Sequence, residues 1–313
     1  MKKMTVFAAA AALAVLTIHG LTGCAARGLN TYPEGEKYSV GDAVFTEPIE
    51  SIDVEWQSGS VRIVTHAEDT VLLTEETGTI LTDDLRVHWW QDGATLRVRF
   101  TASGARTELL GMHRKELTLT VPETAVFRNV SVDSASARVS ADDLASDVVS
   151  ISAASGAIDA VCDAQHILLD TASGSVSLRQ TGFADEININ TASGGIDARL
   201  ERVEALHLNS ASGAVNAEAD EVNALAVKTT SGRIDCRLHA LSSGSAALSS
   251  TSGGVTLTLP ESAGFLARVR TSSGRFQSDF AMRKDGELYH CGDGSADVDI
   301  ETTSGSIDLC RGA

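Results

Sequence analysis

The sequence is poor in aromatic residues, in proline and in long apolar runs. Aromatic residues make up 4% of its 313 residues, and only 4 prolines occur. So few rings argue against a surface that binds sugars by stacking, and so few prolines argue against a proline-rich disordered chain. After residue 24 there is no apolar run long enough to cross a bilayer, and no stretch with the 3.6-residue period of a helix. These absences favour an all-β domain.

Basic residues are also scarce. Lys and Arg number 25 against 42 Asp and Glu, which gives a net charge of −17 at pH 7. Residues 1–23 contain two lysines and no acids, so their removal would change the net charge from −17 to −19. Nucleic acids and anionic lipid surfaces are therefore poor partners for this chain. The histidines are scattered without the spacing of metal ligands, so we expect neither a zinc site nor a cofactor.

What the sequence does contain is a short phrase that returns at intervals of about 20 residues. It reads Ala172-Ser-Gly-Ser-Val176 in one copy and Ala192-Ser-Gly-Gly-Ile196 in the next. A period of this size indicates a solenoid, in which each unit buries its apolar face against its neighbours. The copies centre on Gly156, Gly174, Gly194, Gly213, Gly232, Gly253, Gly274 and Gly305, with Ala137 in a decayed copy.

Both flanks of the phrase alternate between apolar and polar residues. Before Gly194, for example, Ile187 and Ile189 flank Asn188, and the same alternation follows the glycine. This period of two is typical of a strand with one buried and one wet face. We therefore predict a single-stranded parallel β-helix, or β-solenoid, with coils of about 19–21 residues. Each coil is a strand, a Ser-Gly bend, a strand and a return, and the glycine is expected to supply backbone angles that a side chain would penalise.

The predicted solenoid domain covers residues 43–313, with regular repeats in 129–313 and a more irregular β part in 43–128. In the irregular part, two alternating stretches flank Asp92-Gly93, which is a hairpin signal. Residues 117–125 (LTLTVPETA) anticipate residues 255–263 (VTLTLPESA). These stretches form a longer internal repeat, in which a strand stops at a proline and leads into another coil.

Residues 1–23 are typical of a lipoprotein signal peptide. A basic start and an apolar run too short to span a membrane comfortably are followed by the lipobox Leu21-Thr-Gly-Cys24. Cys24 is the predicted lipid-carrying first residue of the mature chain, and residues 24–42 are predicted to be this cysteine and a flexible tether. Two acyl chains would hold the protein stably on the extracytoplasmic face of a bacterial membrane. A plain secretory signal with an incidental cysteine is the alternative.

Taken together, the lipobox, the Asp-Gly strand pair, the Leu-Thr-Val-Pro stretch, the Ser-Gly repeats and the ending after Cys291-Gly-Asp-Gly294 resemble one bacterial family. It is the β-strand-repeat family of proposed adhesins, also called toast-rack domains, and the resemblance covers residues 45–310. It implies a parallel β-solenoid at the cell envelope with no established catalytic residues. Family members are associated with envelope-stress systems or described as adhesins. Ala137 and the four cysteines of the mature domain depart from the pattern.

Those four cysteines fall into two groups. Cys162 and Cys236 share the inward parity and lie four rungs apart, about 19 Å at the spacing of parallel strands. The Cα atoms of a disulfide lie within about 7 Å, so these two are predicted to be buried free thiols. Cys291 and Cys310 are the only remaining pair able to bridge, and a disulfide between them is a possibility that the sequence leaves open.

Outward residues suggest two further kinds of site. The positions three after successive glycines alternate between acidic and neutral residues: Asp159, Ser177, Asp197, Asn216, Asp235 and Thr256. Calcium binding between rungs is one interpretation, but no calcium-binding nonapeptide is present, so avoidance of like charges on adjacent rungs is favoured. The Ser-Gly serines lack the G-x-S-x-G pattern of a nucleophile elbow, which favours turn residues over nucleophiles.

The extra length between Gly274 and Gly305 is interpreted as an excursion over residues 281–292, after which the chain rejoins the stack as its last coil. In that register two arginines face two acids on the next coil, Arg268 with Asp299 and Arg270 with Glu301. The acids of this coil, Asp308 included, would then line the final open edge.

The favoured function is a lipid-anchored, non-catalytic structural or interaction module at the cell envelope, adhesin-like and monomeric. It would present polar ladders to an unknown envelope protein or surface polymer. An accessory protein of an envelope-stress signalling system is one alternative. A carbohydrate-active β-helix enzyme is another, disfavoured because Trp56, Trp89 and Trp90 lie in strands, where burial is the default.

Overall fold

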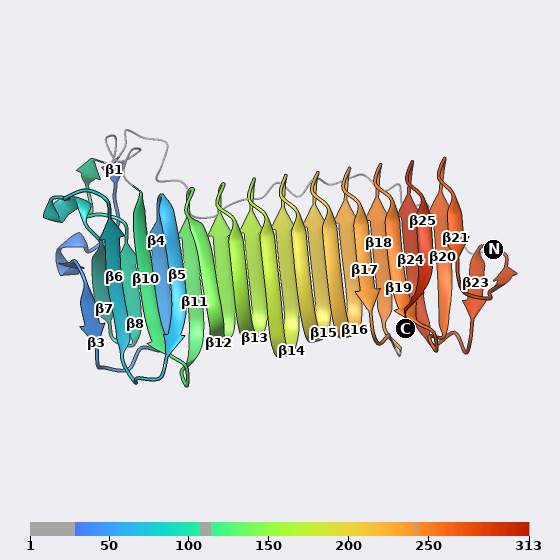
Figure 1. Ribbon diagram of the computed structural model, residues 1–313, viewed down its shortest axis with the longest axis horizontal. Coiled ribbons are helices and arrows are strands. Elements are labelled where there is room, and N and C mark those ends of the chain that lie inside the picture. Colours follow the sequence, from blue (N-terminus) through green and yellow to red (C-terminus); the bar gives the residue numbers. More distant parts are fainter. Residues whose placement is uncertain (1–28, 107–113, 242, 313) are drawn as a thin grey trace, which may run out of the picture.

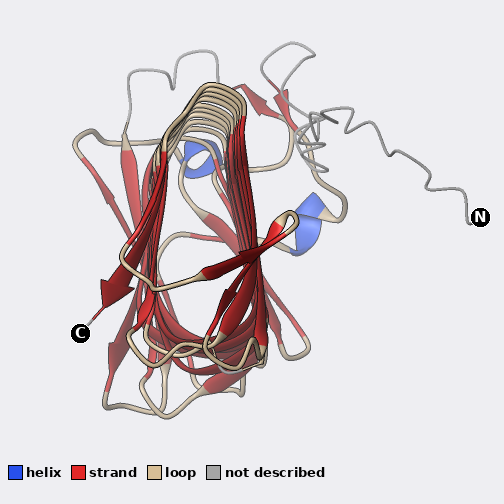
Figure 2. Ribbon diagram, turned by 90° about the vertical axis from the view of Figure 1, so that its right-hand side faces the viewer, coloured by secondary structure: helices blue, strands red, loops and turns tan. Residues whose placement is uncertain are grey.

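The computed structural model describes residues 29–106, 114–241 and 243–312, which are mostly β-strand. Figure 1 shows one long stack of coils, with the N-terminal strands at one end and β20–β23 at the other. Viewed along the stack, the coils form two facing sheets joined by bends (Figure 2). Within these ranges the helical elements are two 3-10 turns, η2 (Gly35–Lys37) and η3 (Asp83–Leu85), and no helix there has the length and apolar character to cross a membrane. The predicted β-solenoid is confirmed.

The strands fall into three sets along the chain. The N-terminal set is β1 (Leu29–Asn30), β2 (Ser39–Val40), β3 (Ala43–Phe45), β4 (Ser51–Trp56), β5 (Gly59–His66), β6 (Val71–Thr77), β7 (His88–Asp92), β8 (Thr95–Arg99), β9 (Ala105–Arg106) and β10 (Lys115–Pro122). The regular set is β11 (Val126–Ser134), β12 (Arg138–Ala153), β13 (Ile158–Thr171), β14 (Val176–Thr191), β15 (Ile196–Ser210), β16 (Val215–Thr229), β17 (Ile234–Leu238), β18 (Ser245–Ser250) and β19 (Val255–Pro260). The C-terminal set is β20 (Phe265–Thr271), β21 (Phe276–Ser278), β22 (Arg283–Asp285), β23 (Leu288–Cys291), β24 (Ala296–Thr302) and β25 (Ile307–Gly312).

Neighbouring coils pair in parallel with their apolar positions in line. Ile167 of β13 faces Ile187 of β14, which faces Leu206 of β15, and all three are at most 2% exposed. The polar residues between them point outward. Because both sheets keep this period of two, a continuous apolar core runs between them along the stack.

The Ser-Gly bends also stack on one another, and glycine is needed there for space. A Cβ on Gly174 would overlap the backbone carbonyl of Gly156, and one on Gly194 would overlap that of Gly174. None of the stacked glycines, from Gly156 to Gly305, has φ in the left-handed region. The prediction that they supply unusual backbone angles is therefore wrong, since the close approach of neighbouring coils is what requires glycine.

A hydroxyl three residues before the glycine holds these bends from Gly174 onward. Thr171 Oγ1 accepts a hydrogen bond from the N–H of Gly174 (3.0 Å) and donates one to the carbonyl of Gly156 in the preceding coil (3.2 Å). This links the local turn to the coil stacked on it, while satisfying polar groups inside the protein. The same pair of bonds recurs at Thr191, Ser210, Ser250, Thr271 and Thr302.

The last coil of the chain is not the last coil of the stack. β24 pairs with β18 on one side and β20 on the other, and β25 pairs with β19 and β21. The predicted register is confirmed, because Arg268 faces Asp299 and Arg270 faces Glu301. The predicted place at the open edge is wrong: Asp299, Glu301 and Asp308 belong to a coil inserted between β18–β19 and the terminal coil β20–β21.

The N-terminal end has the same arrangement. β4 pairs with β8 and β11, and β5 pairs with β10 and β12, so the coil β4–β5 lies between the coils β8–β10 and β11–β12. The chain must therefore step over one coil between β10 and β11, as it does between β19 and β20. The two stretches that make these steps are the longer internal repeat, and in both an alanine N–H bonds to a proline carbonyl, Ala125 to Pro122 (3.1 Å) and Ala263 to Pro260 (3.0 Å).

Antiparallel strands cover the N-terminal end of the stack. β6 pairs with β10 and β3, and β7 pairs with β8 and β2, with β7–β8 forming the predicted Asp-Gly hairpin. Residues 29–42 lie against this end: Tyr32 is buried, donates its hydroxyl to the carbonyl of Thr101 (2.8 Å) and packs on the ring of Tyr38 (4.7 Å). The described part of the predicted flexible tether, residues 29–42, is therefore folded.

Lys115 occupies the bend position of the terminal coil, opposite Gly59, and its side chain fills the end of the core. The ammonium is fully buried, forms an ion pair with Glu75 (2.6 Å), donates to the carbonyls of Leu85 and Phe100, and lies over the Phe100 ring. Burial lowers the pKa of Lys115 to about 8, although Glu75 opposes this shift. The pair is therefore buried at the N-terminal end of the core.

Candidate functional site

Two rows of outward side chains run along one sheet of the solenoid. Row A lies six residues before each bend glycine and row B four before it, so each coil adds one residue to each row about every 4.8 Å. Over β12–β16 and β18, in the middle of the stack in Figure 1, row A is Ser150, Leu168, Asn188, His207, Ala226 and Ala247, and row B is Ser152, Asp170, Asn190, Asn209, Lys228 and Ser249. We call these residues the central strip.

Hydrogen bonds between coils fix several side chains of the central strip. Asn190 Nδ2 donates to Asp170 Oδ1 (2.8 Å), and Asn209 Nδ2 donates to Asn190 Oδ1 (2.9 Å). At the margin of the strip, Asn188 Nδ2 donates to Glu186 Oε1 (2.9 Å). These amides are therefore held in one orientation, which leaves their remaining donors and acceptors facing solvent in fixed positions.

The central strip is almost without charge in a protein of net charge −17. Its formal charges are one acid, Asp170, and one base, Lys228. The outward positions of the other sheet are different: Arg179 and Arg199 accompany the row that begins at Asp159. The predicted acidic–neutral alternation of that row is confirmed, in the order Asp159, Ser177, Asp197, Asn216, Asp235, Thr256, Asp308 and Gln277.

Ion pairs end the two rows on both sides of the central strip. On the C-terminal side, Arg270 Nη2 lies 2.8 Å from Glu301 and 3.3 Å from Asp299. On the N-terminal side, the buried Arg99 lies 2.8 Å from the carboxylate of Asp53 and also contacts that of Glu55. Charge on this face is thus concentrated at the two ends, where it is paired.

Two carboxyl groups on this face have raised pKa values. Burial raises the pKa of Asp133, and the nearby Glu55 and Asp53 raise it further. Burial also raises the pKa of Asp170, against the hydrogen bond from Asn190. Asp133 and Asp170 are two rungs apart, about 9.6 Å between strands. Both project from the same face of one sheet, with Ser152 on the rung between them.

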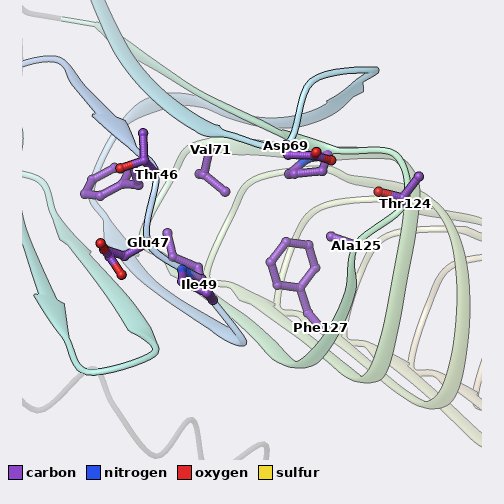
Figure 3. A pocket seen from close by; sticks show the side chains of 11 residues that line it. Thr46, Glu47, Ile49, Asp69, Val71, Thr124, Ala125 and Phe127 are labelled. Carbon is purple, nitrogen blue, oxygen red and sulfur yellow. The ribbon is translucent and has the colours of Figure 1, made fainter.

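The pocket in Figure 3 lies beside the crossover that follows β10. Its volume is about 280 Å³, and Phe45, Val71 and Phe127 contribute apolar walls while Glu47 and Asp69 contribute carboxylates. Ligand pockets usually measure about 300–1,000 Å³ and bring several polar groups together. This cavity is smaller than that range, and we assign it no ligand.

The cysteines are placed as follows. Cys24 lies outside the described residues. Cys162 and Cys236 are buried free thiols, as predicted, and burial raises the pKa of each to about 12. Cys291 and Cys310 are also free in the structure, so it does not contain the disulfide that the sequence left open. Cys291 Sγ donates a hydrogen bond to the carbonyl of Ala263 (3.6 Å). This bond links the excursion over residues 281–292 to the crossover between β19 and β20.

The remaining sequence candidates do not assemble into a reactive centre in the described ranges. No group of three His, Cys, Asp or Glu side chains there has the arrangement of a metal site. Trp56 is buried, and Trp90 is half-buried between Tyr38 (ring centroids 5.8 Å apart) and the ammonium of Lys37 (4.6 Å). The tryptophans therefore serve the fold and the attachment of residues 29–42.

The parallel coils and the stacked Ser-Gly bends define the class of protein, an all-β parallel solenoid. The chain belongs to the Toastrack DUF4097 family, whose model matches residues 49–310. No curated protein matches the sequence.

Solved structures with low sequence identity also resemble the chain. A proposed adhesin from Parabacteroides merdae is 12% identical, with a TM-score of 0.45, and the match covers 87% of this chain and 96% of that one. A proposed lipid-binding protein from Parabacteroides distasonis is 10% identical, with a TM-score of 0.36 and coverage of 88% and 97%. A proposed cell adhesion protein from Clostridium sporogenes is 11% identical, with a TM-score of 0.20 and coverage of 88% and 100%. These identities are too low to transfer a function.

Proposed function

We propose that this protein is a lipid-anchored, non-catalytic interaction module of the bacterial cell envelope, and that the central strip is its binding surface. One observation carries the proposal: the strip is a regular, nearly uncharged array whose amides are held by the bonds from Asn209 to Asn190 and from Asn190 to Asp170. Side chains that are already ordered lose little conformational entropy when a partner binds.

Two features support a role in binding and not in catalysis. The raised pKa values of Asp133 and Asp170 belong to carboxyls on one open sheet face, which encloses no substrate and excludes no water. The cavity beside β10 is small, and none of the residues that line it belongs to the central strip.

The lipobox Leu21-Thr-Gly-Cys24 supports the anchor. Five residue steps separate Cys24 from Leu29, where β1 begins, and at most about 3.6 Å per residue gives a reach of about 18 Å. An anchor at Cys24 would therefore hold the N-terminal end of the stack near the membrane. The central strip would extend away from this end along the solenoid (Figure 1).

Cys24→Ser tests the anchor. We expect the protein to move from the membrane fraction to the soluble fraction, and an unchanged distribution would contradict lipid anchoring. The soluble variant then tests the surface, by its retention on isolated cell envelopes. Asn190→Arg in the central strip should abolish retention, whereas the control Ser177→Arg on the other sheet should preserve it. Equal retention of both variants would contradict the assignment of the strip.

A further inference from the structure

We propose that the central strip binds an extended, uncharged polysaccharide whose sugar rings lie along the stack, one ring to each coil. This inference names the partner of the surface described above, and so it rests on the proposed function. It follows from the spacing, the charge and the hydrogen-bonding groups of the strip.

The spacing of the rows selects the class of polymer. The coils repeat about every 4.8 Å, whereas an extended peptide rises about 3.3 Å per residue and repeats its side chains about every 6.6 Å. A polyproline II segment rises about 3.1 Å per residue. Neither peptide stays in step with the rows over several coils. A sugar chain with equatorial 1,4 linkages advances by close to one rung for each ring, and because successive rings are turned over by about half a turn, equivalent ring faces meet the strip at every second coil.

The near absence of charge on the strip favours an uncharged polymer over an anionic one. A protein of net charge −17 repels nucleic acids and anionic glycans, and no row of arginines or lysines on the strip offsets that repulsion. Asp170 and Lys228 are its only formal charges, and the ion pairs of Arg270 and Arg99 lie outside it. An uncharged polymer avoids the repulsion and needs no counter-charge.

The side chains of the strip match sugar hydroxyl groups. Asn190 and Asn209 offer amide groups that both donate and accept, in orientations already fixed between coils. Leu168 is 39% exposed, and the small Ala226 and Ala247 leave room for the C–H face of a ring. Because the strip has no aromatic platform, each ring should bind weakly, and affinity should accumulate over successive rings.

Binding to soluble oligosaccharides tests this inference. The full chain carrying Cys24→Ser is titrated by calorimetry with cellohexaose and chitohexaose, and with the corresponding disaccharides. We expect one of the hexasaccharides to bind and its disaccharide to bind at least tenfold more weakly. Asn190→Ala with Asn209→Ala should weaken hexasaccharide binding roughly tenfold or more, because it removes hydrogen bonds from two rungs. The control pair Asp197→Ala with Arg199→Ala, on the other sheet, should change it less than twofold.

Equal affinity for a disaccharide and its hexasaccharide, full affinity in the Asn190–Asn209 variant, or no binding of either hexasaccharide would each overturn the polysaccharide inference. Retention of the same variant on cell envelopes separates this failure from failure of the proposed function. If retention falls although no glycan binds, the interaction surface stands with a different partner. If retention is unchanged as well, both proposals are wrong.

Discussion

The stacked glycines should be the least replaceable residues of the solenoid. In Gly194→Ala the added Cβ would overlap the backbone carbonyl of Gly174 in the neighbouring coil, and the paired strands on both sides of each bend hold its backbone in place. The two coils must separate at the bend. That separation breaks the bonds from Thr191 Oγ1 to the carbonyl of Gly174 (3.3 Å), from the Ser193 N–H to the preceding coil (3.1 Å) and across the start of β14 (2.9 Å). At about 0.5–1.5 kcal/mol for each bond, the variant should lose roughly 2–4 kcal/mol of unfolding free energy.

The adjacent glycine provides a matched control. A Cβ on Gly195 would lie 3.4 Å from the carbonyl oxygen of Ala214, which is an ordinary contact, so Gly195→Ala should change the unfolding free energy by less than about 0.5 kcal/mol. Urea unfolding followed by circular dichroism measures both variants, and amide exchange shows whether the damage stays near the bend of Gly194. If the two variants are equally stable, the reasoning from the close approach of the coils is refuted.

Three further predictions concern the ends and the interior. Lys115→Met should cost about 3–5 kcal/mol in urea unfolding, because it leaves the buried carboxylate of Glu75 with only the more distant Arg86 (3.8 Å) as a partner; adding Glu75→Leu should recover much of that loss, and no recovery would contradict the ion pair. Arg268→Glu with Arg270→Glu should speed amide exchange in β24, because it places like charges opposite each other on β20 and β24. Adding Asp299→Lys with Glu301→Lys should restore the slow exchange, and unchanged exchange in the first variant or no restoration in the second would contradict this register. Burial raises the pKa of Cys236 to about 12, above its value of about 8.5 when unfolded, so the folded state holds the thiol proton more tightly and the stability from this group declines as pH rises from about 8.5 towards 12. Unfolding measured across that pH range should show a smaller decline in Cys236→Ala, and an identical decline would count against a buried thiol.

The sequence predicts the coil well because its signals are local. The alternation around Gly194 and the constant phrase length determine which residues of each strand face inward, and the structure confirms that pattern in the regular coils. The order in which the coils stack at the two ends cannot be predicted in the same way. A coil with the standard pattern fits any place in the stack, so spacing alone does not show that β24–β25 lies inside β20–β21. The repeated proline stretches before β11 and β20 do mark the crossovers, but nothing in their composition states that they span two rungs.

Part of the candidate surface can be predicted from the sequence. The residues six and four before each glycine can be aligned without a structure, and that alignment already shows the scarcity of charge in the central strip. The chain of bonds from Asn209 to Asp170 cannot be predicted in this way, because it depends on side-chain orientation between coils. The folded part of the tether also escaped prediction: Tyr32 and Tyr38 form no periodic pattern, and only their contacts with the N-terminal strands show that they are packed.

Site-specific cross-linking in living cells tests the proposed binding surface most directly. A photo-reactive residue is placed at Asn190 in the central strip or, as the control, at Ser177 on the other sheet, and cross-linked products are identified by mass spectrometry. The account predicts a discrete product at Asn190, from an envelope protein or a glycan, that is absent at Ser177. The same product at both positions, or none at Asn190 in cells where the protein is folded and present at the envelope, would contradict it.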